Sequence, residues 1–366
     1  MKVEINMINV EDGDAIILML EKENRKALVV IDGGVKKHYD KLKRRLEEVL
    51  PFYNNTISLV ICTHYDNDHL GGIGCLLDDY HKIVQQIWIH KIESTLNEQS
   101  SLMQTRLGVL ENKYLTIEKI QEYANVKSLN STLVVEGYRE LISLIKKLNR
   151  YGLESKIKEP FRGDFLEGFE EFVVVSPSRA YYESYLGELK TEAFVDDVEE
   201  NVFKTTNLLV EDNYTGGVRS MRKFSDLMQP CEKLESSSVA NNVTATNMVS
   251  IVTLLKVDNK KYLFTADAGI ETFESQHLLE NEELKDLEWL ELPHHGSKNN
   301  TSKRMLSHFD PKIVFVSADG GENRPHYLIN ACLGQKRAGN KVYVTNDPVN
   351  TWYIKYDGSE FARIYV

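Results

Sequence analysis

The segment Thr63-His64-Tyr65-Asp66-Asn67-Asp68-His69-Leu70-Gly71-Gly72 decides the fold of this chain. It brings two imidazoles and two carboxylates into the short stretch from His64 to His69. Neutral imidazole nitrogens and ionised carboxylates are the side chains that bind first-row divalent metals. A polar turn whose aspartate caps the next helix would explain one carboxylate, but not four potential ligands. The segment therefore predicts a metal site.

The residues on either side of this segment predict where the site lies in the fold. The apolar run 57–62 is typical of a buried strand, and residues 70–77 are typical of the start of a helix. The four side chains then occupy a tight loop between a strand and a helix. Without a cation among them, side chains this close would repel one another or stay without partners.

The pattern His-x-Asp-x-Asp-His-x-Gly-Gly resembles the first ligand motif of the metallo-β-lactamase fold, whose commoner form has histidine at the position of Asp66. The aspartate variant is similar to the soluble hydrolase domain of ComEC-type competence proteins and their stand-alone relatives. This resemblance covers roughly residues 1–90, 170–180 and 247–366. It implies an αββα sandwich, in which two mixed sheets lie face to face and loops at one edge carry the ligands.

Two segments near the N-terminus strengthen the resemblance. Residues 5–18 read as a strand, an Asp-Gly turn and a second strand, and they include the family's Gly-Asp-Ala hairpin. Residues 27–34 read as a strand that ends in Asp32-Gly33-Gly34. The resemblance implies that Asp32 accepts a hydrogen bond from a ligand histidine and so orients it.

Two segments in the last third of the chain supply further ligands by the same resemblance. Residues 247–255 and 260–269 read as paired strands, and Asp267 at their end is the aspartate that bridges two ions about 3.5–4 Å apart. The sequence Pro-His-His-Gly-Ser at 293–297 follows. At least one of His294 and His295 should bind metal; the choice stays open, with a preference for His295.

Three side chains are candidates for direct catalytic roles. His326 follows a strand and Gly/Asn loop at 313–325, and it is expected to protonate a leaving group or to hold an anionic oxygen. Lys298 lies just after the paired histidines and is expected to contact a phosphate. Asp66 is counted both as a catalytic residue and as a ligand.

The chain departs from the family at its third motif, where Ser176 stands in place of a histidine. One metal position then keeps Asp68, His69, Asp267 and a histidine of the 294–295 pair, whereas the other keeps only His64, Asp66 and Asp267. We expect one or two divalent ions, zinc or manganese, with magnesium as a further option because the second position is rich in oxygen. A mononuclear or degenerate site is the alternative.

Composition indicates the cellular compartment and the redox state in which we expect the protein. The chain has 366 residues, 44 basic and 55 acidic, and a formal net charge of −11. Its apolar runs are shorter than the roughly 20 residues that span a bilayer, so we expect no membrane segment. No signal-peptide pattern stands at the start, which favours a cytoplasmic protein. The cysteines Cys62, Cys75, Cys231 and Cys332 form no CxxC pair, so we expect neither a disulfide nor a thiolate metal site.

The domain prediction is a single metallo-β-lactamase-like domain over 1–366 with two insertions. Residues 91–165 carry apolar residues at helical spacing and predict a helical insertion whose stripe at 141–148 packs on the core. Residues 180–246 are more polar and predict a mobile insertion or lid that shapes substrate access or binds a protein partner.

The leading functional hypothesis is a phosphodiesterase or nuclease that cleaves DNA or RNA with metal-activated water. The substrate class rests on the resemblance alone. A small-molecule phosphodiester, lactone or thioester hydrolase is one alternative, and a non-catalytic metal-binding interaction module is another. The family's use in antiphage operons makes a defence role conceivable.

Overall fold

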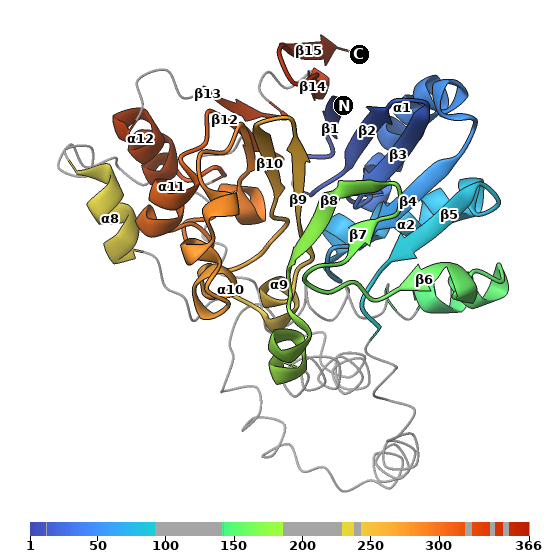
Figure 1. Cartoon of the computed structure of the whole chain (residues 1–366), viewed down its shortest axis with the longest axis horizontal. Coiled ribbons are helices and arrows are strands. Elements are labelled where there is room, and N and C mark those ends of the chain that lie inside the picture. The colour runs from blue at the N-terminus through green and yellow to red at the C-terminus, as the bar shows by residue number, and fades with distance from the viewer. Residues whose placement is uncertain are drawn as a thin grey trace, which may run out of the picture.

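The computed structural model describes residues 1–11, 13–91, 141, 143–185, 229–237, 243–318, 324–336, 341–346 and 351–365. Within these ranges the strands form an eight-stranded sheet, ordered β15-β14-β1-β2-β3-β4-β5-β6, and a seven-stranded sheet, ordered β13-β12-β11-β10-β9-β8-β7. The sheets face each other, with helices on the outer face of each (Figure 1). The predicted αββα sandwich is confirmed.

The strands of the first sheet are β1 (Lys2–Ile8), β2 (Ile16–Lys22), β3 (Arg25–Ile31), β4 (Ile57–Ile61), β5 (Val84–Trp88), β6 (Ile157–Lys158), β14 (Thr351–Tyr356) and β15 (Phe361–Tyr365). Those of the second sheet are β7 (Phe165–Leu166), β8 (Phe169–Ser176), β9 (Val252–Val257), β10 (Lys260–Phe264), β11 (Trp289–Glu291), β12 (Ile313–Val316) and β13 (Lys341–Val344).

The α-helices with defined bounds are α1 (Tyr39–Val49), α2 (Asn67–Tyr80), α8 (Pro230–Ser237), α9 (Ala245–Met248), α10 (Ile270–Ser275), α11 (Lys303–Phe309) and α12 (Tyr327–Lys336). Short 3₁₀ helices cover Lys36–His38, Leu50–Tyr53, Glu154–Lys156, Leu278–Glu280, Glu282–Leu284 and Pro293–Gly296. Residues 143–150 and 179–185 are also helical. None of the described helices combines the length and the apolar composition needed to cross a bilayer.

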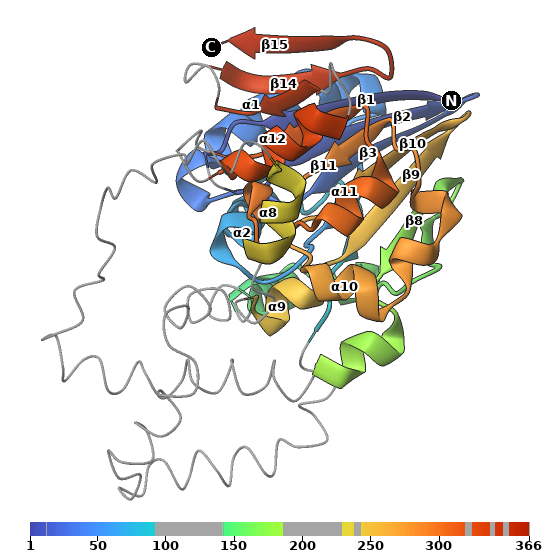
Figure 2. The same cartoon turned by 90° about the vertical axis from the view of Figure 1, so that its left-hand side faces the viewer.

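Three apolar layers hold the sandwich together, because successive side chains of a strand point to opposite faces of its sheet. Leu18 and Val29 face inward and pack in the layer that also contains Phe172 and Trp289 of the second sheet. Their neighbours in sequence face outward into a layer with α1 and α2. A third layer joins the second sheet to α10, α11 and α12, and Figure 2 shows these helices over that sheet.

The candidate ligands follow strands whose carboxyl ends meet at one edge of the sandwich. In the first sheet β3, β4 and β5 run parallel, and Asp32 and His64 come directly after two of them. In the second sheet β10, β11 and β12 run parallel, and Asp267 and His294 follow two of them. The topology thus places loops from both sheets side by side.

Gly72 in α2 lies directly against Gly33 in the loop after β3. Gly72 N donates to Gly34 O at 2.8 Å, and a Cβ on Gly72 would overlap the carbonyl oxygen of Gly33. No rotamer change can relieve an overlap with backbone. This contact brings the start of α2, with its ligands, close to Asp32.

We expect Gly72→Ala to destabilise the protein by about 3 kcal/mol, because the added methyl group forces two backbone segments apart. Gly334→Ala in α12 is the matched control, since no atom lies within 4 Å of its added Cβ; it should be neutral or stabilising by about 1 kcal/mol. Urea unfolding measures both, and equal stabilities for the two variants would contradict the close packing.

The prediction of no disulfide is wrong, because Cys231 of α8 and Cys332 of α12 are bonded to each other. The two cysteines are 101 residues apart, so no sequence spacing signals the pair. Packing of α8 against α12 brings them together. Cys62 and Cys75 are free, as expected.

The two predicted insertions lie largely outside the described residues. At the end of the first, residues 143–150 are helical and Leu141, Leu144, Ile145 and Leu148 pack in the core, as predicted. The helical prediction is wrong for 157–158 and Phe165, which belong to β6 and β7. The strand predicted from Asn247 is wrong at its start, where Thr244 caps the short helix α9 by accepting from Asn247 N.

Candidate metal centre

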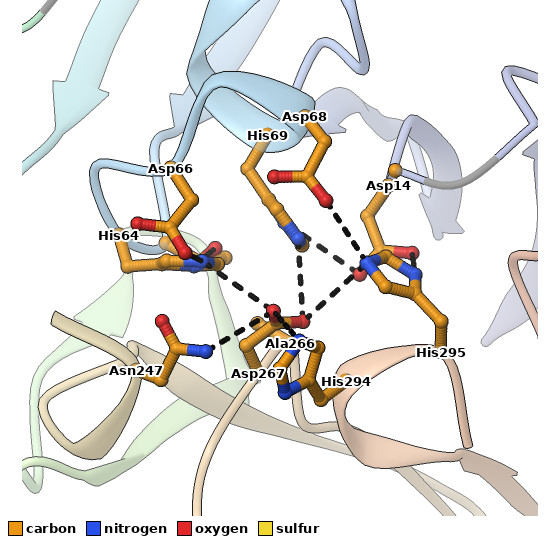
Figure 3. Close-up of polar contacts among 12 residues, drawn as sticks. Asp14, His64, Asp66, Asp68, His69, Asn247, Ala266, Asp267, His294 and His295 are labelled. Carbon is orange, nitrogen blue, oxygen red and sulfur yellow. Dashed lines mark hydrogen bonds and ion pairs between the residues drawn. The ribbon is translucent and has the colours of Figure 1, made fainter. Parts of the chain in front are cut away.

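The loop after β4 carries His64 and Asp66, and the first turn of α2 carries Asp68 and His69; Figure 3 shows all four side chains around Asp267. Asp66 occupies the N-cap position of α2, but its side chain makes no capping hydrogen bond. His64 and His69 are buried, with their ring centroids 4.1 Å apart. The capping alternative therefore does not account for the aspartates.

Asp267 divides the surrounding side chains into two groups, one for each carboxylate oxygen. Its Oδ1 lies 3.3 Å from His69 Nε2 and 3.9 Å from His295 Nε2, and the latter nitrogen lies 3.2 Å from Asp68 Oδ2. The first group is therefore Asp68, His69, His295 and Asp267.

The second group gathers around Asp267 Oδ2. That oxygen lies 3.7 Å from His64 Nε2 and 3.5 Å from His294 Nε2, and His64 Nε2 lies 3.8 Å from Asp66 Oδ2. Ligand atoms of both groups lie close enough together to hold an ion. The two histidines of the 294–295 pair thus face different oxygens of Asp267, and His295 joins Asp68 and His69.

Each of the four histidines is anchored through Nδ1. His69 Nδ1 donates to Asp32 Oδ2 at 2.8 Å, and His295 Nδ1 donates to Ser317 O at 2.8 Å. His64 Nδ1 lies 3.0 Å from Thr63 Oγ1, and His294 Nδ1 lies 3.1 Å from Asn300 Oδ1. Carboxylate and carbonyl oxygens only accept, and the Thr63 hydroxyl donates its proton to Asp32 Oδ2, so each Nδ1 carries the proton and each Nε2 directs its lone pair at the centre when a metal is bound.

Buried atoms at the centre lack hydrogen-bond partners among the described residues. They are His64 Nε2, His69 Nε2 and Asp267 Oδ1. Buried polar atoms are normally paired, so three orphaned ligand atoms that face one another fit one or two divalent ions. The donor set of imidazoles and carboxylates suits a divalent metal ion.

The electrostatics of the cluster also fit a cation. Burial opposes charge on every group, but the neighbouring histidines hold the pKa of Asp267 well below its usual range. Burial likewise disfavours charge on His295, yet the carboxylates of Asp267 and Asp68 raise its pKa to about 9. The same carboxylates raise the pKa of His69, whereas burial lowers that of His64 to about 3. Without a metal, protons on His69 and His295 balance the carboxylates.

Four residues of the centre have left-handed backbone. The φ angles of Asp32, Ala266, His294 and His295 are 57°, 46°, 50° and 54°, which cost energy for residues other than glycine. Buried Glu291 stabilises one of these turns by accepting from Thr265 N at 2.9 Å and Ala266 N at 3.2 Å. Such strain, held by its surroundings, is typical of functional loops.

The structure adds Asp14, which the sequence showed only as part of a hairpin. Asp14 is 3% exposed; its Oδ2 lies 3.6 Å from His69 Nδ1 and its Oδ1 lies 3.9 Å from His295 Nδ1. Burial raises the pKa of this carboxyl to about 6. Asp14 thus lies beside the Nδ1 atoms of His69 and His295, and Asp32 accepts a hydrogen bond from His69 Nδ1.

The backbone of His326 lies against the loop of the paired histidines, and Lys298 follows that loop in the chain; neither belongs to the groups of possible ligands among the described residues. His326 N donates to Gly296 O at 2.9 Å, and the ring Nδ1 accepts from Leu328 N at 3.3 Å. Burial and the charge of Lys298 lower the pKa of His326. Asp66, the third catalytic candidate, lies in the second ligand group.

Arg324 is a basic residue that the sequence reading did not assign to the site. Burial lowers the pKa of His294, and the charge of Arg324 lowers it further; the same charge opposes the rise in the pKa of His295. Arg324 therefore acts electrostatically on both paired histidines. Lys298 and Arg324 are called the cationic rim below, and His326, whose pKa is lowered, is not counted in it.

Comparison with known families agrees with the fold and the site. Residues 17–106 match the family model described as the metallo-beta-lactamase superfamily. No curated protein matches the chain. This match and the groups of histidine and aspartate together indicate a metal-dependent hydrolase.

Proposed function

We propose that the protein is a metal-dependent phosphodiesterase that cleaves DNA or RNA, with the ComEC-like relationship inferred from its sequence motifs. The observation that carries the proposal is the cationic rim beside a carboxylate-rich centre. A phosphodiester is an anion, so Lys298 and Arg324 suit its phosphate oxygens. A neutral lactone or thioester gains nothing from these charges.

In this proposal each group of residues has a separate role in metal binding, orientation or phosphate binding. His64, Asp66, Asp68, His69, Asp267, His294 and His295 hold one or two ions. When bound, the ions supply Lewis-acid stabilisation of the developing charge and acidify water. Asp32 orients His69 through their 2.8 Å hydrogen bond. Lys298 and Arg324 position the phosphate, and His326 protonates the leaving oxygen or holds an anionic oxygen.

The remaining parts of the proposal come from the sequence. They are a single domain over 1–366, a cytoplasmic location, a protein partner bound through 180–246 and a role in antiphage defence. Manganese or zinc is the proposed metal, with magnesium a further option. A hydrolase of small phosphodiesters is the second candidate, because the rim would bind a small anion equally well.

We expect Arg324→Gln and Lys298→Gln each to lower kcat/KM for a phosphodiester about tenfold to a hundredfold, mainly through KM, because each removes a charge-assisted contact. The probes are an oligonucleotide and bis(p-nitrophenyl) phosphate with manganese, and the neutral ester p-nitrophenyl acetate should be unaffected. Lys312→Gln is the control, since Lys312 pairs with Glu288 at 2.9 Å.

Four outcomes separate the candidates. Cleavage of the oligonucleotide supports the nuclease, and cleavage of the aryl phosphodiester alone favours the small-molecule enzyme. Hydrolysis of a lactone or thioester without either would contradict both. Metal binding without any hydrolysis would favour the non-catalytic interaction module.

A further inference from the structure

Asn247 of α9 lies against the oxygen of Asp267 that faces His64. Its Nδ2 lies 3.4 Å from Asp267 Oδ2, and that oxygen lies 3.7 Å from His64 Nε2. The side chain is buried, and Figure 3 shows its carboxamide directed at Asp267 beside His64 and Asp66. Next to it, Thr246 Oγ1 lies 3.3 Å from Asp66 Oδ1. The start of α9 therefore borders the second ligand group.

Ser176, which stands where the family has a histidine, is occupied elsewhere. Its hydroxyl accepts from Gln276 Nε2 at 2.9 Å. Gln276 Oε1 in turn accepts from Ser178 N at 2.8 Å and from Arg162 Nη2 at 3.0 Å. This chain of hydrogen bonds fixes the loop after β8, so Ser176 serves the loop and not the second ligand group.

The carboxamide of Asn247 has partners that tolerate either orientation. Its Oδ1 lies 2.9 Å from Thr244 Oγ1 and 3.2 Å from Thr246 Oγ1. Hydroxyl groups accept as readily as they donate. Turning the carboxamide by half a rotation therefore keeps both contacts and brings Oδ1 to the position of Nδ2. A donor there suits the bare carboxylate of Asp267, whereas an oxygen there suits a cation.

We propose that Asn247 binds, through Oδ1, the ion held by His64, Asp66 and Asp267, and so replaces the ligand that Ser176 does not supply. The inference rests on the metal centre of the proposed function, but not on its substrate. Amide oxygen is a ligand for hard cations, so the replacement favours manganese or magnesium over zinc at this position. The other position, with Asp68, His69 and His295, keeps its nitrogen ligands.

The test is a manganese titration of metal-free protein, followed by calorimetry and by the electron paramagnetic resonance of the bound ions. Wild type should bind two ions and give the signal of a coupled pair. Asn247→Ala should weaken the second ion at least about tenfold and remove the coupled signal, while the first ion binds as before. Asn247→Asp should restore the second ion, because it returns an oxygen ligand. Ser176→Ala should bind both ions like wild type.

The proposal is overturned if Asn247→Ala binds both ions like wild type, if wild type binds a single ion, or if Ser176→Ala loses the second ion as well. Should Asn247→Ala fail to unfold cooperatively without metal, Asn247→Asp decides: loss of the second ion in that variant overturns the proposal, and retention supports it. No step depends on hydrolysis, so an inactive protein that shows the expected titration would refute the proposed function and leave this inference standing.

Discussion

Asp267→Asn should release both metal ions and lower any metal-dependent hydrolysis by more than about a hundredfold. Loss of a single partner that merely orients a ligand already costs about tenfold to a hundredfold, and Asp267 is shared by both ligand groups. Its Oδ1 faces His69 and its Oδ2 faces His64 and His294. Asparagine keeps the shape but removes the charge and one acceptor, so both positions weaken together.

Elemental analysis after manganese loading measures the metal content of this variant, and a phosphodiester assay measures its activity. Asp258→Asn is the matched control, because Asp258 lies on the β9–β10 hairpin and is 81% exposed. It should keep both ions. If Asp267→Asn retained the wild-type metal content and activity, the centre described here would be wrong, whatever the substrate.

The loop that carries the first ligands could be predicted from sequence because its ligands are contiguous. A short loop joins β4 to α2, and the segment from His64 to His69 runs from this loop into the first turn of α2, so local patterns indicate both the position and the types of the possible ligands. Asp32 follows β3 directly and Asp267 lies shortly after β10, and the resemblance to the family, not the strand pattern alone, implied their roles.

The remaining partners depend on contacts between distant segments. Asp14 reaches His295, and Asn247 reaches Asp66 through its neighbour Thr246, only after the two sheets have closed on each other. No local pattern marks such residues, because a polar side chain in a hairpin or at a strand end is ordinary in isolation. The disulfide between α8 and α12 escaped prediction for the same reason.

The role of Ser176 could be read only in part from the sequence. The sequence shows that the expected histidine is missing, but it does not show where the serine hydroxyl goes. Only the packing of Gln276 against β8 explains that the position has become part of a structural hydrogen-bond chain.

Metal affinity should rise steeply with pH, because the empty centre holds protons that an ion must displace. Burial opposes the charge on His295, but Asp267, Asp68 and Asp14 raise its pKa to about 9, against the opposing charge of Arg324. The pKa of His69 is raised by the same carboxylates. Below these pKa values, affinity should fall about tenfold per pH unit for each displaced proton. His64, whose pKa is lowered to about 3, should release none near neutrality.

The thermal stability of the metal-free protein, unlike its metal affinity, should fall as the pH rises above neutrality. His295 has a raised pKa, so its contribution is complete below 6.5 and is lost as the pH rises through about 9. Asp68 and Asp267 have lowered pKa values, so their contribution is complete above 3.8 and is lost in acid. Burial lowers the pKa of His64 to about 3, so this group costs stability as the pH falls below 6.5. Thermal unfolding without metal should therefore show its highest Tm near pH 6.5, whereas saturating manganese should shift that maximum to higher pH.

Calorimetry in buffers of different ionisation enthalpy counts the protons released on binding. One to two protons per protein should leave between pH 6 and 8, and the count should approach zero well above pH 9. His295→Gln should reduce it by about one, since that variant has no imidazole to deprotonate. A count of zero at pH 7 in wild type would mean that His69 and His295 are already neutral. The carboxylates would then be balanced by another cation, and the charge distribution proposed for the empty centre would be wrong.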